Sequence, residues 1–304
     1  MRRNKRHKKW PLIMAWLAAG LLLTTSSALA QGSIFGSVTN SNASTPANGE
    51  ISFYGYLDNT DEELRIETST GAGYDAGFWF DDFQNYLTEA PGNPYDYHFY
   101  NIANGEGFVL SKTIPNNSFQ QENIALAPVT WPAAPGGLNG FALSSSRILL
   151  RWNRVAGLTY HIYRRIAASG GSFFRLDDPT GSLANPGVTD SFFVDATSDG
   201  VSSYEYIIIA QNISGVMGPH SSILTVSATN VLAPTLASIS PASGVNTGGT
   251  LVTINGSGFD PGGTTVTFGS TPVAGSYVSP YRLTATTPSG TGVVNVTVTN
   301  TASG

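Results

Sequence analysis

The chain has 304 residues with 15 Lys and Arg against 20 Asp and Glu, and only 12% of its residues are charged. It contains no cysteine, which excludes a disulfide scaffold, a thiolate metal site and a cysteine nucleophile. The hydrophobic share of 41% is too high for a disordered chain, and the length suits two or three domains. The composition therefore predicts a folded, mostly neutral, multidomain protein.

The first 30 residues have the three parts of a secretory signal peptide. Six basic residues precede Trp10, and an apolar run follows from Trp10 to Leu23. This run is shorter than the roughly 20 residues of a membrane-spanning helix, and the small residues Ala28 and Ala30 suit a signal peptidase. We predict cleavage after Ala30, with an uncleaved signal anchor as the alternative. No transmembrane span is expected in residues 31–304, so the mature protein is predicted to be extracellular or at a cell surface. The absence of cysteine in an exported chain favours a bacterial envelope.

Residues 31–304 consist of short runs in which apolar and polar residues alternate, separated by Gly, Pro, Asn and Ser; examples are 33–38, 147–152, 204–210 and 293–298. Such runs predict an all-β chain of tandem immunoglobulin-like β-sandwich domains. Proline-bearing segments at 131–137 and 229–234 are expected to be extended, stiff joints. They divide the mature chain into domains at 31–131, 132–229 and 233–304.

The negative charge is concentrated in the first domain. Between Gln31 and Trp131 there are 13 acidic residues and only two basic ones, Arg65 and Lys112, whereas the charges after Trp131 balance. An anionic surface repels phosphate, so nucleic acid is excluded as a partner of the exported chain.

The start of the first domain, residues 32–53, is hairpin-like and similar to the carboxypeptidase regulatory-like domains. This resemblance implies a small transthyretin-type sandwich of the kind found in exported bacterial proteins. It fades beyond Phe53. Farther along, Trp79, Phe83, Tyr86 and Leu87 stand at helical spacing, which predicts a short helix inserted in a mainly β domain.

Carboxylates in the first domain are candidate ligands for Ca²⁺, the ones singled out being Asp75, Asp81, Asp82 and Asp96. Oxygen ligands from several loops suit this cation, but no run matches the Asp-x-Asp-x-Asp-Gly loop with its distal Glu. A solvated acidic face is therefore the favoured interpretation, with bound Ca²⁺ as the alternative. No other cofactor is expected, since no paired-His spacing for zinc occurs.

Aromatic residues of the same domain are candidates for binding carbohydrate, and the set comprises Trp79, Tyr86, Tyr95 and Tyr97. Exposed rings stack on the apolar faces of sugars while nearby carboxylates accept hydrogen bonds from the hydroxyls. A small domain without disulfides also needs large side chains to bury enough area, so the favoured interpretation is that these rings form the core.

The middle domain resembles the fibronectin type III family along nearly its whole length. The resemblance rests on Trp152 in an early strand and on 204–215, which looks like the late strand of that family with its tyrosine corner. It implies that Trp152 packs between two sheets, that the Tyr204 hydroxyl turns back onto backbone, and that Asp195 binds turn amides. No Arg-Gly-Asp tripeptide is present, so the adhesive loop of some members is not carried over.

The third domain resembles the IPT/TIG family of immunoglobulin-like domains, on the segments 239–244, 248–256, 258–259, 266–269, 287–288 and 294–298. Gly248 and Gly249 are expected to form a tight turn. Gly256 and Gly258 are expected to relieve steric crowding where the chain leaves a strand. Some family members bind DNA, but Arg282 is the only basic residue after Arg175, which excludes that role. The family's sandwich has a further strand after 294–298. We therefore expect either another molecule to close the sheet or, as the favoured interpretation, the sequence to be a piece of a longer protein.

Catalysis is not predicted. Asp81 and Asp82 are adjacent on one element and rarely face each other across a cleft, and no Gly-x-Ser-x-Gly elbow or phosphate-binding loop occurs. We predict a non-catalytic exported protein that acts as a spacer, adhesion or interaction scaffold at the bacterial cell surface, with other surface proteins or glycans as partners. The alternatives are a carbohydrate-binding accessory protein acting through the first domain and the non-catalytic front end of a larger exported enzyme.

Overall fold

The computed structural model describes residues 33–57, 62–82, 92–114, 119–178 and 187–301, and its regular elements there are all strands. The prediction of an all-β tandem-domain chain is confirmed. The predicted helix is wrong over residues 78–82, which form strand β5 (Phe78–Asp82). Trp79 and Asp81 are buried while their neighbours are not, a period of two that belongs to a strand. Residues 83–87 and the predicted signal peptide lie outside the described residues. Within those residues, no helix has the length and hydropathy to cross a membrane.

The first domain is a sandwich of two sheets. One sheet has the order β4-β5-β1-β8, with β9 also paired to β1, and the other runs β10-β7-β6-β2-β3. Its described strands are β1 (Ser33–Thr39), β2 (Ile51–Leu57), β3 (Glu63–Ile66), β4 (Ala72–Asp75), β5 (Phe78–Asp82), β6 (Pro94–Asn101), β7 (Glu106–Thr113), β8 (Phe119–Gln121), β9 (Ile124–Ala125) and β10 (Ala127–Pro128).

Aromatic side chains fill the space between these two sheets. The Trp79 ring lies 5.9 Å from that of Phe53, 5.2 Å from Tyr97 and 4.7 Å from Phe99, measured between centroids. All four side chains are at most 1% exposed. Edge-to-face and tilted contacts of this kind stabilise a core beyond the area they bury, so this cluster holds the two sheets together.

The middle domain also has two layers. A three-stranded sheet has the order β11-β12-β15, and it faces a layer ordered β14-β13-β16-β17 with β18 also paired to β16. The strands are β11 (Asn139–Ser144), β12 (Arg147–Arg151), β13 (Thr159–Ile166), β14 (Phe173–Arg175), β15 (Phe192–Asp195), β16 (Ser203–Gln211), β17 (Met217–His220) and β18 (Leu224–Ser227).

The first and middle domains share one sheet. Strand β3 pairs antiparallel with β14, with Leu64 opposite Phe173, and this pairing joins the larger sheets of both domains into one of ten strands. The sequence predicted two sandwiches connected only by a stiff joint at 131–137. The structure differs because the edges of β3 and β14 satisfy each other's backbone hydrogen bonds, which an exposed edge leaves unmade.

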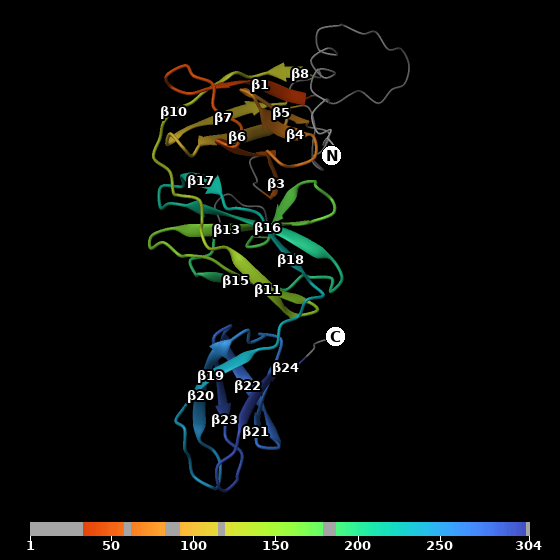
Figure 1. Cartoon of the computed structure of the whole chain (residues 1–304), viewed down its shortest axis with the longest axis vertical. Coiled ribbons are helices and arrows are strands. Elements are labelled where there is room, and N and C mark those ends of the chain that lie inside the picture. The colour runs from red at the N-terminus through yellow and green to blue at the C-terminus, as the bar shows by residue number, and fades with distance from the viewer. Residues whose placement is uncertain (1–32, 58–61, 83–91, 115–118, 179–186, 302–304) are drawn as a thin grey trace, which may run out of the picture.

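The third domain is a six-stranded β-structure with the order β19-β20-β23-β22-β21-β24. It is drawn at the opposite end of the molecule from the first domain in Figure 1. Its strands are β19 (Thr235–Ser240), β20 (Leu251–Ser257), β21 (Thr264–Phe268), β22 (Thr271–Ser279), β23 (Arg282–Thr286) and β24 (Val296–Asn300). The core contains Ile254, Phe259, Val266 and Leu283, each 0% exposed.

Glycine is required at two positions of this domain. Gly248 has a φ of +78°, a left-handed conformation that side chains rarely adopt. At Gly256 an added Cβ would lie 1.9 Å from the Thr235 carbonyl oxygen, so any larger residue would push β19 and β20 apart.

Candidate functional site

The aromatic candidates for sugar binding are inside the first domain. Trp79 is 1% exposed and Tyr95 and Tyr97 are 0% exposed, and the Trp79 indole N–H donates to the Glu122 carbonyl at 3.0 Å. Tyr86 lies outside the described residues. Trp79, Tyr95 and Tyr97 occupy inward positions on β5 and β6, so they present no stacking surface to a sugar. The carbohydrate interpretation of these three rings is corrected to one of core packing.

The candidate Ca²⁺ ligands lie on three strands, β4, β5 and β6, and Asp75 and Asp81 are engaged in contacts within the protein. Asp81 is fully buried, pairs with Arg65 at 2.9 Å and accepts a hydrogen bond of 2.7 Å from the Tyr97 hydroxyl. Asp75 accepts from the Asn48 amide at 2.6 Å, and Asp82 lies in β5 next to Asp81. Asp96 lies in β6, opposite Ser111 of β7.

Over the described part of the chain, no three His, Cys, Asp or Glu side chains form a group able to hold a metal ion. The four carboxylates are therefore not brought together as a cation site. The Arg65–Asp81 pair instead neutralises a charge inside the core, a structural task.

The structural residues of the middle domain have the contacts that the resemblance implies. Trp152 is 4% exposed and packs on Tyr160 at 5.4 Å between ring centroids. The Tyr204 hydroxyl accepts a hydrogen bond of 3.0 Å from the Asp199 backbone N–H, which is the geometry of a tyrosine corner. Asp195 accepts from the Thr197 backbone N–H at 2.9 Å.

Asp195 also receives bonds that the sequence did not predict. The Arg164 guanidinium lies 2.7 Å from its carboxylate, and the Tyr206 hydroxyl donates to it at 2.8 Å. Burial, followed by the neighbouring charge of Asp195, raises the pKa of Tyr206 well above its ordinary value. The Tyr206 hydroxyl therefore stays protonated and keeps donating its hydrogen bond to Asp195.

A buried polar seam joins the first and middle domains. The Tyr100 hydroxyl donates to the Met217 carbonyl at 2.9 Å, and the Tyr54 hydroxyl donates to the Gly218 carbonyl at 3.2 Å. A backbone hydrogen bond of 2.7 Å from the Thr70 N–H to the Gly170 carbonyl also joins the two domains. Apolar side chains of both domains form one cluster around these groups, namely Tyr54, Tyr56, Leu64, Ile66, Tyr100, Tyr163, Phe173, Ile207, Ile209 and Met217.

Two histidines of this seam have opposite protonation preferences. His98 stacks on Tyr54 with 4.8 Å between ring centroids, and burial lowers its pKa to about 4. For His220 burial alone would also lower the pKa, but the Glu67 carboxylate at 3.2 Å and the Ser221 carbonyl outweigh it and raise the pKa. His98 is thus neutral near pH 7, while Glu67 stabilises the charged form of His220 relative to a free imidazole.

A second contact region joins the middle and third domains. Arg147 of β12 lies 3.5 Å from the fully buried carboxylate of Asp260, and the Asn300 side-chain amide donates to the Leu143 carbonyl at 3.2 Å. The rings of Phe192 and Tyr281 meet edge to face at 6.0 Å. These contacts are polar or aromatic, whereas the seam contains an apolar cluster of ten residues. Sequence reasoning missed this contact region, because nothing local marks Arg147 and Asp260 as partners.

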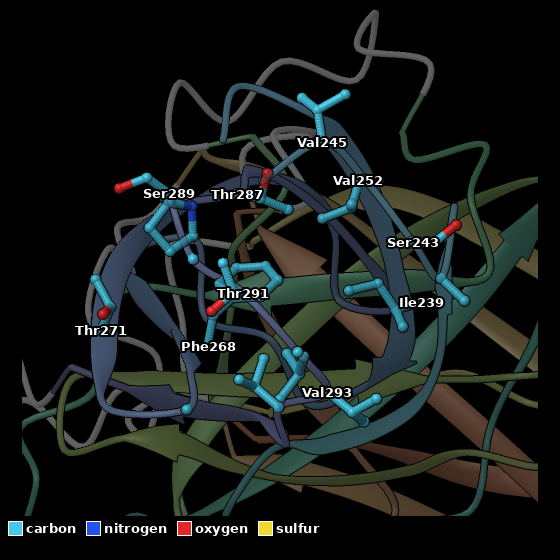
Figure 2. Close-up of a pocket in the computed structure, with 18 of the residues that line it drawn as sticks. Ile239, Ser243, Val245, Val252, Phe268, Thr271, Thr287, Ser289, Thr291 and Val293 are labelled. Carbon is cyan, nitrogen blue, oxygen red and sulfur yellow. The ribbon is translucent and has the colours of Figure 1, made fainter. Parts of the chain in front are cut away.

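A cleft of about 560 Å³ opens into the third domain, between the end of β19 and the start of β24. In Figure 2, Ile239 and Val252 lie on one side of the opening, and Thr271 and Ser289 lie on the other. The loop before β24 contributes Val293, which is fully exposed, and Val294, which is 49% exposed. No residue that lines the cleft is charged, and its apolar side chains alternate with the hydroxyl-bearing residues Ser243, Ser270, Thr271, Thr287, Ser289 and Thr291. The cleft therefore offers shape, apolar contact and uncharged hydrogen-bonding groups.

Comparison with known proteins identifies the third domain. The sequence model of the IPT/TIG domain matches residues 234–304, so this segment is an IPT/TIG domain, as its glycine pattern predicted. Two curated proteins are similar over part of the chain. Fibrocystin-L of Mus musculus is 43% identical over 60 residues, which is 20% of this chain and 1% of that protein. Fibrocystin-L of Homo sapiens is 45% identical over 69 residues, which is 22% of this chain and 2% of that protein.

Solved structures similar to the chain include fibronectin type III proteins. An Fn3-like protein from Clostridium thermocellum is 24% identical, covering 32% of this chain and 94% of that one, with a TM-score of 0.25. The FN1-FN3 domains of chicken CNTN1 are 10% identical, covering 81% of this chain and 83% of that one, with a TM-score of 0.27.

Proposed function

We propose that this chain, whose third domain is an IPT/TIG domain, is a non-catalytic exported scaffold that acts as a rigid spacer and interaction protein at the bacterial cell surface. The observation that carries the proposal is the fusion of the first two domains. They share a ten-stranded sheet and one apolar cluster, so they form a single rigid body. A spacer needs such rigidity, because flexible joints would let its ends approach each other.

The third domain extends this body. Its contacts with the middle domain include the ion pair of Arg147 with Asp260, the hydrogen bond from the Asn300 amide to the Leu143 carbonyl and the ring contact of Phe192 with Tyr281. Small polar interfaces of this kind allow limited movement. The chain would thus present the IPT/TIG domain at the end of a stiff, two-domain stem.

The absence of a catalytic role is supported by the environment of the polar groups. Buried charges such as Asp81 and Asp177 are paired with arginine, at 2.9 Å to Arg65 and 3.0 Å to Arg175. Paired, fully buried carboxylates have no access to a substrate, whereas acid–base residues line a cleft. The domain types present are ones that typically bind other proteins.

Export is tested by expressing the whole chain in a bacterial host and sequencing the N-terminus of the purified protein. We expect the released form to begin at Gln31. An intact Met1 on a protein retained in the cytosol would refute this part of the proposal.

Rigidity is tested on the same material by small-angle X-ray scattering. A spacer gives one elongated particle whose maximum dimension is independent of salt concentration. A dimension that varies with salt concentration, or scattering that fits only domains tumbling independently, would count against it.

A further inference from the structure

Lys112 is the only lysine in residues 31–304, and it lies near the end of β7 in the first domain. It stands directly opposite Tyr95 of β6, whose side chain is buried between the two sheets. Directly opposed residues point their side chains to the same face of a sheet, so the Lys112 side chain points toward the second sheet. It is 45% exposed, which places its amine at the rim of the core.

One carboxylate oxygen contacts both this amine and a carboxamide. Glu122, which follows β8, accepts a hydrogen bond of 2.5 Å from the Lys112 amine at its Oε1. The same oxygen accepts a hydrogen bond of 2.7 Å from the Gln120 amide. A carboxylate between two nitrogen atoms is able to take a proton from one and give it to the other. The three side chains therefore bring a nucleophile, a proton carrier and an amide together.

The carbonyl end of the Gln120 amide is buried beside Tyr95. Among the described residues, its Oε1 has no hydrogen-bond partner. Burial, followed by the charge of Glu122, raises the pKa of Tyr95 above its ordinary value, although a hydrogen bond with Gln120 acts in the other direction. The Tyr95 hydroxyl therefore stays protonated, and it is a donor for the carbonyl oxygen when that oxygen gains negative charge.

We propose that Lys112 and Gln120 form an intramolecular amide crosslink, with Glu122 as the proton carrier. The Lys112 Nζ attacks the side-chain carbonyl carbon of Gln120, and a new C–N bond forms. Glu122 takes a proton from the attacking amine and passes it to the Gln120 Nε2. The bond from the carbon to Nε2 then breaks, and this nitrogen leaves as ammonia. The products are one secondary amide and one ammonia, so the step balances without an oxidant, a reductant or a second substrate.

Gln120, and not Glu122, is the acyl group that reacts. An ionised carboxylate repels a nucleophile and has no leaving group, whereas a carboxamide loses ammonia once its nitrogen is protonated. The position of the Lys112 amine at the rim of the core gives that ammonia a path to solvent.

The crosslink joins the two sheets of the first domain, because β7 and β8 belong to different sheets. In a chain without cysteine it has the effect of a disulfide, since it removes conformational freedom from the unfolded state. The reaction occurs once in each molecule and uses only the chain's own side chains. It therefore goes beyond the scaffold role without giving the protein an external substrate.

Trypsin digestion of the denatured full chain detects the bond. Between Arg65 and Arg147 the sequence has one tryptic site, Lys112, and an acylated lysine is not cleaved. The unreacted protein gives separate peptides 66–112 and 113–147, whereas the crosslinked protein gives one peptide 66–147 that lacks one ammonia. Peptide masses are needed because an N-terminal Gln31 also loses ammonia when it cyclises. Before digestion the protein is kept at mildly alkaline pH, where more of the amine is neutral.

Two variants test the role of Glu122. Glu122→Gln keeps a side chain of similar size that hydrogen-bonds but cannot carry the proton. Gln121→Ala changes the exposed neighbouring glutamine and serves as the matched control. Circular dichroism checks that each variant is folded, and the digest of the native chain needs no variant at all.

We expect the crosslinked peptide 66–147 from the native chain and from Gln121→Ala, and at least tenfold less of it from Glu122→Gln. A native chain that gives only the two separate peptides would overturn the proposal, as would equal crosslinking in Glu122→Gln. Loss of water in place of ammonia would show a bond to a carboxylate, and the proposal would be wrong. Export and rigidity are measured separately, so failure here leaves the proposed scaffold role intact.

Discussion

Replacing Leu64 by alanine tests whether the first two domains unfold as one. Leu64 lies on β3, is 0% exposed, stands opposite Phe173 of the middle domain and belongs to the cluster that both domains share. Truncating a fully buried leucine costs about 2–5 kcal/mol, because apolar burial is lost and a cavity is left. Since the cavity lies in a shared core, we expect this loss in the unfolding of both domains together.

Denaturant unfolding of the chain from Gln31 onward, followed by residue-resolved hydrogen exchange, is the assay. Leu64→Ala should lower the stability of amides in β6 and in β16 by the same amount. The control Leu283→Ala removes a leucine of the third domain's own core, also 0% exposed. It should destabilise β20 and β23 and leave the other two domains unchanged. If Leu64→Ala weakened β6 while β16 kept its full stability, the shared-core reasoning would be refuted.

Three further substitutions test particular contacts. The pKa of His98 is lowered from 6.5 to about 4, so between these pH values the unfolded chain binds a proton that the folded chain does not. About 3 kcal/mol of stability should therefore be lost on going from pH 7 to pH 4. In urea unfolding measured at each pH, His98→Gln should reduce that loss. His220 acts in the opposite sense, since its raised pKa adds stability that is present at low pH and lost as the pH rises through the pKa of the folded state. Because both chains keep His220, comparing His98→Gln with the native chain isolates the contribution of His98. Tyr204→Phe removes the hydroxyl that accepts the Asp199 N–H and should cost about 1–2 kcal/mol in urea unfolding of the middle domain; an unchanged midpoint would show that the tyrosine corner contributes nothing. Arg147→Met removes the counter-ion of the buried Asp260 and should broaden the interdomain distances in small-angle scattering while the first two domains keep their stability, whereas an unchanged profile would mean that this pair does not hold the joint.

Local patterns in the sequence predicted much of the fold. The alternation of apolar and polar residues predicted the strands. The tyrosine corner could be predicted because the Tyr204 hydroxyl and the backbone amide that it contacts are five residues apart. The glycine pattern of the third domain identified its family. Each of these signals depends on residues close together in the chain, or on a motif whose spacing is itself informative.

The predictions that failed concern contacts between elements that are far apart in the sequence and meet only in the folded structure. Glu63–Ile66 and Phe173–Arg175 pair across more than 100 residues of sequence, and no local pattern marks either strand as the partner of the other. Trp79 was assigned to a helix from its spacing to Phe83, Tyr86 and Leu87, but it lies in β5 and packs against Phe53 and Phe99. Residue type suggested a sugar or cation site in the first domain, but the inward direction of Tyr95, Tyr97 and Asp81 is set by the register of β5 and β6.

The central claim is that the first two domains form one rigid body, and a distance distribution between them tests it most directly. The chain has no cysteine, so spin labels can be placed at two introduced cysteines without background. Lys112→Cys on β7 and Thr225→Cys on β18 are both at exposed positions, one in each domain. Pulsed electron–electron double resonance should give a single distance peak no broader than the label itself produces. A broad or two-peaked distribution in the native protein would contradict the account.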